Sequence, residues 1–328
     1  MKGRSKMKGK VTRREFIGSA AAVAAYSMMP RHVLAQGASK PNSNFNGVQI
    51  GAITYSFRAL PSSADDILGY LVKVGLSSTE MMSGPVEEFA GAPSATQIPR
   101  QARGTKMTEE QRAQMQAARE AQAKELVKWR QSPPWEKFKE FRRKYNNEGV
   151  AINIIKFDNL GRMSDVELDY AFNAAKTLGA KGITCEISED TAKRVGPWAD
   201  KHKIMVGFHN HTQVNSQSFD TPLSYGRYLA LNLDVGHYVA GTNESPIPII
   251  QKYADRILSL HIKDRKINNG ENMPLGQGDT PVALILQLMK KEKYPFTADI
   301  EYEYRTPEGS DVLTEIAKCV EFCKNALA

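Results

Sequence analysis

Residues 150–187 read VAINIIKFDNLGRMSDVELDYAFNAAKTLGAKGITCEI, and this stretch contains one strand–helix–strand unit. The runs 150–157 and 182–187 are short and rich in β-branched residues, which is typical of buried strands. The segment that begins at Ser164 has the composition of a helix, and Gly179 marks its end. Because a helix separates the two strands, the pattern predicts a parallel pair joined by a crossover.

The same alternation of strands and helices extends along the chain in both directions. A helix with one apolar stripe is predicted over 63–74, and the chain ends on a predicted helix at 311–327. An open, doubly wound sheet would be expected to carry a glycine-rich phosphate-binding pattern after its first strand, and this chain lacks one. The pattern therefore favours a (β/α)₈ TIM barrel. The eight predicted strands are 48–57, 77–82, 150–157, 182–187, 203–209, 228–237, 256–264 and 296–304.

The segment 84–148 is too long to be a simple crossover between the second and third strands. Thr108 and Gln111 form a capping-box pattern at the start of a long polar helix. Ser132 and Pro133 are expected to start the next helix. We interpret 84–148 as a helical insertion, with two alternatives: a lid over the barrel mouth, or an outer helix pair.

The first residues of the chain have the features of an export signal. The pair Arg13-Arg14 precedes a short apolar stretch, 16–29, and small residues at 33 and 35 suit a cleavage site. Such a pair is typical of twin-arginine signals, and the apolar stretch is too short to span a bilayer. An uncleaved anchor or a basic tail is the alternative. We expect a periplasmic or secreted protein, with a signal peptide at 1–35, a linker at 36–46 and a barrel domain at 47–328.

The positive charge of the chain is concentrated in this leader. The whole chain has a net charge of +8, from 44 bases and 36 acids. Residues 1–35 contain eight bases and one acid, so the remainder has an excess of one base. A nucleic-acid partner needs a basic surface, and the mature chain is not expected to have one. Nor is a membrane contact expected after signal cleavage. The three cysteines, Cys185, Cys319 and Cys323, are interpreted as structural.

Ionisable residues gather at the predicted carboxyl ends of the strands. Four of the six histidines lie there, and every strand from the third onward contributes an ionisable group. In a barrel these ends converge on one site, so the residues are expected to lie close together. The residues at these ends are Lys156, Glu186, His209, His211, Asp234, His237, His261, Lys263, Glu301 and Glu303.

Imidazoles and carboxylates on neighbouring strands suit a divalent ion such as Mn²⁺, Zn²⁺, Co²⁺ or Fe²⁺. We favour Asp234, His261 and Glu301 as ligands, with the fourth position supplied by His209 or Glu186. Taken singly, Asp234 would also fit a turn and Glu301 a charged rim. His211 and His237 are expected to contact the ligands or a substrate. The set as a whole predicts a metal site.

The motifs GFHNH, LDVGH, LHIKD, LGQGDTP and DIEYE, in this order, resemble the xylose isomerase-like TIM-barrel superfamily of sugar isomerases and epimerases. The resemblance covers roughly 48–325, apart from the insertion. It implies a divalent metal and a small carbohydrate substrate. By motif, Asp234, His261 and Glu301 match three metal ligands, and His237 matches a histidine that contacts the substrate. The resemblance gives no oligomeric state.

The chain departs from the family pattern at the fifth strand, where His209 stands in place of the glutamate that sugar epimerases carry. Those enzymes use two metal-bound carboxylates to remove and return a proton, so a symmetric 3-epimerase is less favoured. Glu301 or Glu186 is the candidate base next to a substrate carbonyl. Candidate proton donors are His211, His237 and Lys263, and Lys156 is a candidate for holding the substrate or for a solvated rim position.

The expected function is a metal-dependent isomerase or epimerase that acts by proton abstraction beside the carbonyl of a keto-sugar or sugar derivative. Two alternatives stay open: a 3-keto-glycoside lyase, and an exported sugar-binding protein without catalysis. An abasic-site endonuclease shares the barrel, but the predicted export and the near-neutral mature chain argue against it.

Overall fold

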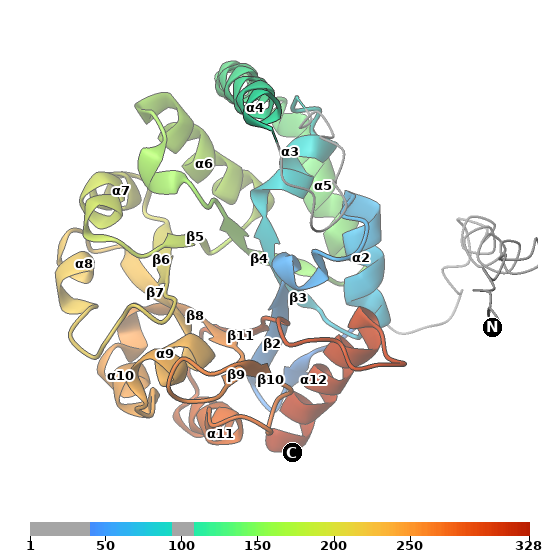
Figure 1. Ribbon diagram of the computed structural model, residues 1–328, viewed down its shortest axis with the longest axis vertical. Coiled ribbons are helices and arrows are strands. Elements are labelled where there is room, and N and C mark those ends of the chain that lie inside the picture. Colours follow the sequence, from blue (N-terminus) through green and yellow to red (C-terminus); the bar gives the residue numbers. More distant parts are fainter. Residues whose placement is uncertain (1–39, 94–107) are drawn as a thin grey trace, which may run out of the picture. The chain divides into compact units, whose positions relative to one another are not determined.

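The computed structural model describes residues 40–93 and 108–328. Within them, eight parallel strands close into a barrel, because the last strand pairs with the first and the first with the second (Figure 1). The (β/α)₈ prediction is therefore confirmed. The export signal and the linker at 36–39 lie outside the described residues. The barrel strands are β2 (Val48–Ile53), β3 (Ser78–Met82), β4 (Ala151–Lys156), β5 (Gly182–Glu186), β6 (Met205–His209), β7 (Leu229–Asp234), β8 (Ile257–Ile262) and β11 (Thr297–Ile300).

A ring of helices surrounds the barrel (Figure 1), and the main apolar core lies between the ring and the strands. A second, small apolar cluster of Ile154, Ala230 and Leu258 joins β4, β7 and β8. Of three further short strands, β1 (Asn44–Phe45) pairs with β2, whereas β9 (Asp264–Arg265) and β10 (Asn272–Met273) form a separate two-stranded sheet. The helices are α2 (Ala64–Lys73), α3 (Ser83–Phe89), α4 (Glu109–Arg130), α5 (Trp135–Asn147), α6 (Asp165–Leu178), α7 (Glu189–His202), α8 (Asp220–Ser224), α9 (Val235–Thr242), α10 (Ile247–Lys252), α11 (Val282–Glu292) and α12 (Val312–Ala326).

Local sequence explains the ends of α6, the crossover helix between β4 and β5. The Ser164 amide donates to Glu167 Oε2 over 3.1 Å at its start. Gly179 ends it with a positive φ of 77°, a conformation that glycine adopts without strain. Both features follow the sequence prediction for this unit.

Three predicted strands extend at least three residues too far at their carboxyl ends. The first stops at Ile53, because Thr54–Phe57 forms a 3₁₀ turn. The sixth stops at Asp234, whose side chain caps α9 instead of continuing the strand. The eighth stops at Ile300, so Glu301 and Glu303 lie in the loop that follows. Residues predicted at strand ends therefore lie at or just beyond them.

The segment 84–148 contains most of α3 and the whole of α4 and α5. Phe138, Phe141 and Tyr145 of α5 are fully buried in the main core, so α5 belongs to the ring of helices. Its start differs from the prediction: the helix begins at Trp135 after Pro134, and Ser132 does not cap it. Two consecutive prolines explain the shift, since the residue before a proline avoids helical geometry.

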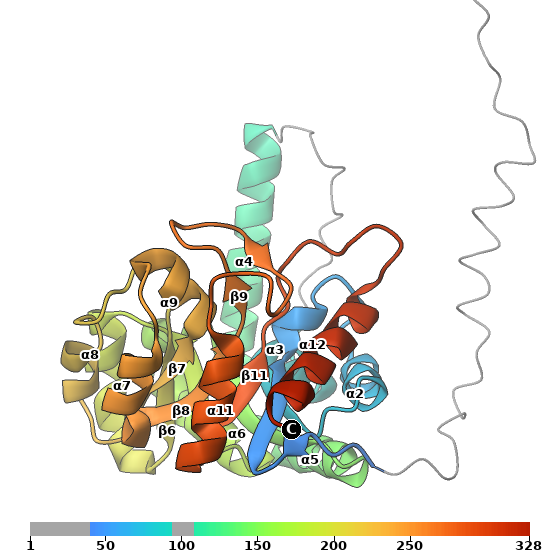
Figure 2. The same cartoon turned by 90° about the horizontal axis from the view of Figure 1, so that it is seen from below.

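Helix α4 begins at the predicted capping box, in which the Gln111 amide donates to Thr108 Oγ1 over 3.1 Å. The helix extends away from the barrel (Figure 2), and most of its side chains are exposed. At its carboxyl end Arg130 is buried and donates to Glu87 and Glu167 over 2.8 and 3.0 Å. None of the described residues 108–148 lines the site cavity, and the choice between a lid and an outer helix pair stays a prediction.

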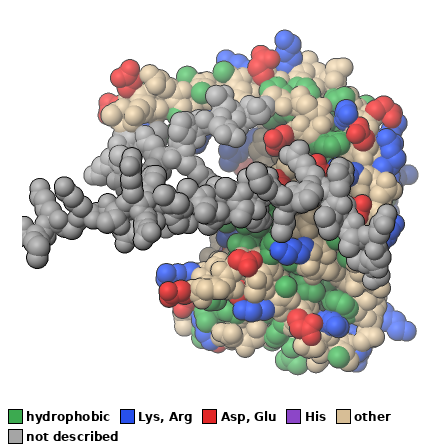
Figure 3. Space-filling model, turned by 90° about the vertical axis from the view of Figure 1, so that its right-hand side faces the viewer, with side chains coloured by type: hydrophobic (Ala, Val, Ile, Leu, Met, Phe, Trp, Pro, Cys, Tyr) green, Lys and Arg blue, Asp and Glu red, His purple; other side chains and the backbone are tan. Residues whose placement is uncertain are grey.

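The surface carries both signs of charge. On the face shown in Figure 3, acidic and basic side chains are interspersed. Among the described helices, none is long and apolar enough to cross a membrane. The three cysteines are buried free thiols, which agrees with a structural role.

Candidate functional site

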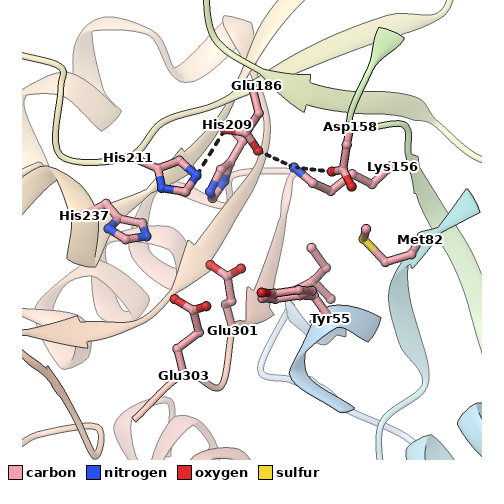
Figure 4. A pocket seen from close by; sticks show the side chains of 11 residues that line it. Tyr55, Met82, Lys156, Asp158, Glu186, His209, His211, His237, Glu301 and Glu303 are labelled. Atoms are coloured by element: carbon pink, nitrogen blue, oxygen red, sulfur yellow. Dashed lines mark hydrogen bonds and ion pairs between the residues drawn. The ribbon is translucent and has the colours of Figure 1, made fainter. Parts of the chain in front are cut away.

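A cavity of about 230 Å³ opens at the carboxyl ends of the barrel strands (Figure 4). Seven of the ten residues predicted at the strand ends line it, and the other three, Asp234, His261 and Lys263, are buried. The parallel register explains this convergence, because Glu186 pairs with His209 and Asp234 pairs with His261. The lining residues are Ile53, Tyr55, Met82, Lys156, Asp158, Glu186, His209, His211, His237, Glu301 and Glu303.

Four side chains in this region could hold one cation. His209, Asp234, His237 and Glu301 each offer a ligand atom, and these atoms all lie within 4.8 Å of one another. Asp234 Oδ1 accepts from the His237 amide over 2.6 Å, whereas the buried Oδ2 has no hydrogen-bond partner. The ion-pair partner of this oxygen is Lys263, whose Nζ lies 3.2 Å away. A buried carboxylate beside imidazoles and a second carboxylate fits a borderline divalent cation.

His261, a predicted ligand, lies beside this group and not within it. Its Nδ1 lies 3.1 Å from Glu301 Oε2, and its Nε2 lies 2.9 Å from Oε2 of the fully buried Glu80. The pKa of His261 is well above its usual range: burial opposes the charge, but the two carboxylates outweigh it. The role of His261 as a ligand therefore stays a prediction.

Lys263 is the central cation of the site. Its Nζ lies 3.2 Å from Asp234 Oδ2 and 2.7 Å from one oxygen each of Glu301 and Glu303. Burial lowers the pKa of Lys263, but these three carboxylates raise it above the usual value. In turn, although burial opposes ionisation of Glu301, Lys263 and His261 hold the pKa of its carboxyl well below its usual range.

His237 is held neutral between two cationic groups. Its Nδ1 lies 2.7 Å from Arg265 Nη1 and its Nε2 lies 3.0 Å from Lys263 Nζ. Burial, followed by the Lys263 charge, lowers the pKa of His237 to about 3. A neutral imidazole has one lone pair, and in His237 it faces either the Arg265 guanidinium or the Lys263 ammonium.

The opposite wall of the cavity carries a second polar group (Figure 4). Lys156 Nζ lies 2.9 Å from Glu186 Oε1, and His211 Nε2 lies 3.2 Å from Glu186 Oε2. The hydrogen bond that His211 donates to Glu186 raises the pKa of His211. Burial raises the pKa of Glu186, but His211, His209 and Lys156 together hold it below its usual range. Glu186, His209 and His211 also form a possible cation group that shares His209 with the first.

The loop 274–280 does not supply backbone donors to the cavity. The amides of Gly276, Gly278 and Thr280 donate to the buried carboxylate of Asp264 over 2.9, 2.8 and 3.1 Å. A Cβ at Gly278 would lie 2.0 Å from Asp264 Oδ1, so the close approach requires glycine. The glycines of this loop shape its contact with Asp264.

Glu80 is the main feature that sequence reasoning missed. It lies in β3, the weakest of the predicted strands, and it contacts His261 across 181 positions of sequence. Burial opposes its ionisation, but His261 and Lys156 hold its pKa below the usual value. The only signal in the sequence was an acidic residue between two residues of a predicted strand, Thr79 and Met81. The structure buries both of these neighbours.

Comparisons with known proteins agree with this architecture. Residues 184–324 match the profile of the xylose isomerase-like TIM barrel family. No match to the chain was found among curated protein sequences.

Several crystal structures are similar over most of the chain. A probable 3-DHS dehydratase from Bacillus anthracis shares 14% identity at a TM-score of 0.57, covering 84% of this chain and 99% of that one. A sugar phosphate isomerase/epimerase from Parabacteroides distasonis shares 17% at 0.54, covering 88% and 97%. A D-allulose 3-epimerase from Methylomonas sp. shares 12% at 0.53, covering 88% and 99%. At these identities the similarity establishes the fold. The protein is thus a (β/α)₈ barrel whose residues 184–324 match the xylose isomerase-like TIM barrel family.

Proposed function

We propose that this protein is a divalent-metal-dependent sugar isomerase or epimerase that removes a proton beside the carbonyl of a keto-sugar or sugar derivative. The observation that carries the proposal is the convergence of His209, Asp234, His237 and Glu301 beside the buried Lys263. A bound cation would polarise the substrate carbonyl and stabilise the negative charge left by proton removal. Sugar-processing proteins among the similar structures support a small carbohydrate substrate.

The side chains of the cavity divide into two walls with different tasks. Glu301, kept ionised by Lys263 and His261, is the proton acceptor on one wall. On the other wall Glu186 is a second carboxylate, and His211 beside it, whose pKa the Glu186 carboxylate raises, is the proton donor. Lys263 has a raised pKa and several carboxylate partners, which suits charge stabilisation better than proton donation. Lys156 holds Glu186 and reaches toward the substrate space.

A 3-keto-glycoside lyase is the second candidate. The observation that favours it is His209, which stands on β6 where a two-base epimerase is expected to carry a carboxylate. Glu186 is 42% exposed in its side chain and already pairs with Lys156 and His211. If it does not act as a base, proton removal from one side only would suit β-elimination.

The test is incubation of the protein in D₂O with keto-sugars and 3-keto-glycosides, after loading with Mn²⁺, Zn²⁺, Co²⁺ or Fe²⁺. Deuterium in intact sugar identifies an isomerase or epimerase, and release of the aglycone identifies a lyase. Asp234→Ala should abolish turnover, whereas Asp220→Asn, on the exposed surface, should not. Sugar binding without turnover, retained in Asp234→Ala, would instead identify a binding protein.

A further inference from the structure

Two buried side chains beneath the cavity, Glu80 and Asn232, have no role in the chemistry above. We propose that they are positioning residues, which fix the ring nitrogen that His209 and His261 each turn toward the cation site. The inference rests on the proposed function only in taking a cation as what these imidazoles bind. The orientation of His209 is a property of the protein alone.

Glu80, on β3, is fully buried. Its Oε1 accepts from Thr184 Oγ1 over 2.6 Å. Its Oε2 accepts from Asn232 Nδ2 over 3.0 Å and lies 2.9 Å from His261 Nε2. An ionised carboxylate can only accept hydrogen bonds, so His261 Nε2 carries the proton. The other nitrogen of His261, Nδ1, faces Glu301 and the cation site.

Asn232 transmits the orientation from Glu80 to His209. Both protons of its amide nitrogen are used, one by Glu80 and one by Ser259 Oγ over 2.6 Å. The amide oxygen must therefore point the other way, where it lies 3.1 Å from His209 Nδ1. A flipped amide would bring its oxygen against the carboxylate of Glu80, which is repulsive. His209 thus donates from Nδ1, and its Nε2 keeps a lone pair.

Only an unprotonated ring nitrogen can bind a cation, so this network decides which atom of His209 is available. Through the hydrogen bond relayed by Asn232, Glu80 selects Nε2 of His209. At His261 it engages Nε2 directly, so that Nδ1 is the nitrogen on the side of the cation site. Burying a carboxylate is costly even when it is fully hydrogen-bonded, and apolar side chains of similar volume would avoid the cost. Besides filling space, the network orients the imidazoles of His209 and His261.

The test is NMR of protein labelled with ¹⁵N at histidine, in which two-bond ¹H–¹⁵N correlations identify the protonated nitrogen. His209 is measured without metal, and His261 after addition of Zn²⁺. We expect the Nδ1–H tautomer of His209 in the wild type. Asn232→Leu removes the acceptor and should convert His209 to Nε2–H, with Zn²⁺ affinity about 10–100-fold lower.

Two further variants separate orientation from general disruption. Glu80→Gln keeps an oxygen that can accept from Asn232 and His261, so His209 should keep its Nδ1–H tautomer. Glu80→Leu removes this acceptor, and His209 should no longer be held in the Nδ1–H tautomer. Thr184→Val is the matched control, because it removes a hydrogen bond to Glu80 but touches neither imidazole. Both histidines should keep their wild-type state in it.

The wild-type spectrum is decisive even if a variant fails to fold: an Nε2–H tautomer of His209 overturns the inference. An unchanged Nδ1–H tautomer in folded Asn232→Leu also overturns it. Failure of the wild type to bind any divalent cation would count against the proposed function, while the His209 tautomer would still decide this inference.

Discussion

At the scale of single residues, the site is organised around the buried ammonium of Lys263. Asp234, Glu301 and Glu303 all lie within 3.2 Å of its Nζ. Carboxylates packed this closely repel one another unless a cation neutralises them. Lys263 therefore stabilises the arrangement of side chains that the proposed chemistry needs.

Removing this ammonium should destabilise the metal-free protein strongly. Lys263→Met leaves buried carboxylates without their partner, and we expect a loss of about 3–5 kcal/mol in the free energy of unfolding. Urea denaturation in the presence of a chelator measures it. Zn²⁺ should restore more stability to the variant than it adds to the wild type. The control is Lys252→Met, which breaks an exposed pair with Asp220 and should leave the free energy of unfolding nearly unchanged.

Glu186 should make the free energy of unfolding depend on pH in the acid range. In the folded protein the pKa of Glu186 lies below its usual value. Its contribution to the free energy of unfolding is therefore fully present when the pH is above the ordinary glutamate pKa of about 4.3, and it is lost as the pH falls through the folded pKa. The stability gap between wild type and Glu186→Gln should be constant above about pH 5 and narrow below about pH 4. Because the side chain is 42% exposed, the gap should be small. A gap that widens toward acid pH, in denaturation curves measured across this range, would contradict the assignment.

At the scale of elements, the junction of β7 and α9 gives Asp234 two tasks. One carboxylate oxygen caps α9 through the His237 amide, and the other faces the candidate cation site. The strand therefore ends where the helix begins, and the cap fixes His237 one turn from Asp234.

Two substitutions separate these tasks. Asp234→Asn keeps an acceptor for the cap but lacks the charge, so Zn²⁺ affinity should fall with little change in stability. Asp234→Ala loses both, and removal of the cap should cost about 1 kcal/mol more than the asparagine variant. Calorimetric titration and thermal unfolding measure the two effects. Equal Zn²⁺ affinity in wild type and Asp234→Asn would exclude Asp234 as a ligand.

Helix α4 is attached to the barrel mainly at one end. Arg130 forms buried ion pairs with Glu87 and Glu167, and Trp129 packs on the core beside it. Arg130→Ala leaves both carboxylates buried and unpaired, so we expect a loss of about 3 kcal/mol in stability. Limited proteolysis should cut the variant faster within α4. Arg119→Ala, on the exposed part of the same helix, is the matched control and should behave as wild type.

At the scale of the whole chain, the net positive charge and the barrel belong to different parts of the sequence. The excess of bases belongs to residues 1–35, whereas the barrel strands all lie between residues 48 and 300. We propose that the leader directs export of the folded barrel through its twin arginines. Replacing both Arg13 and Arg14 by lysine should leave the protein in the cytoplasm at its unprocessed mass. Cell fractionation with mass spectrometry tests this, and normal export of the double variant would contradict it.

The sequence by itself determined the order of strands and helices and the chain positions where ionisable residues gather. These features are local: strand and helix patterns repeat over a few residues, and parallel strands bring their carboxyl ends together whatever the side chains are. His209, Asp234 and Glu301 could therefore be placed near one cavity in advance. Their roles as ligands stay predictions.

Only the tertiary structure decided how these side chains pair. The contact between Glu80 and His261, the four partners of Lys263 and the turn of Asn232 toward His209 join residues far apart in sequence. Strand patterning shows that a residue is buried but not which group it will face, and a polar strand such as β3 gives little warning of a buried carboxylate. The physical reason is that hydrogen bonds and ion pairs act over a few ångströms, so their partners are fixed only once the barrel has closed.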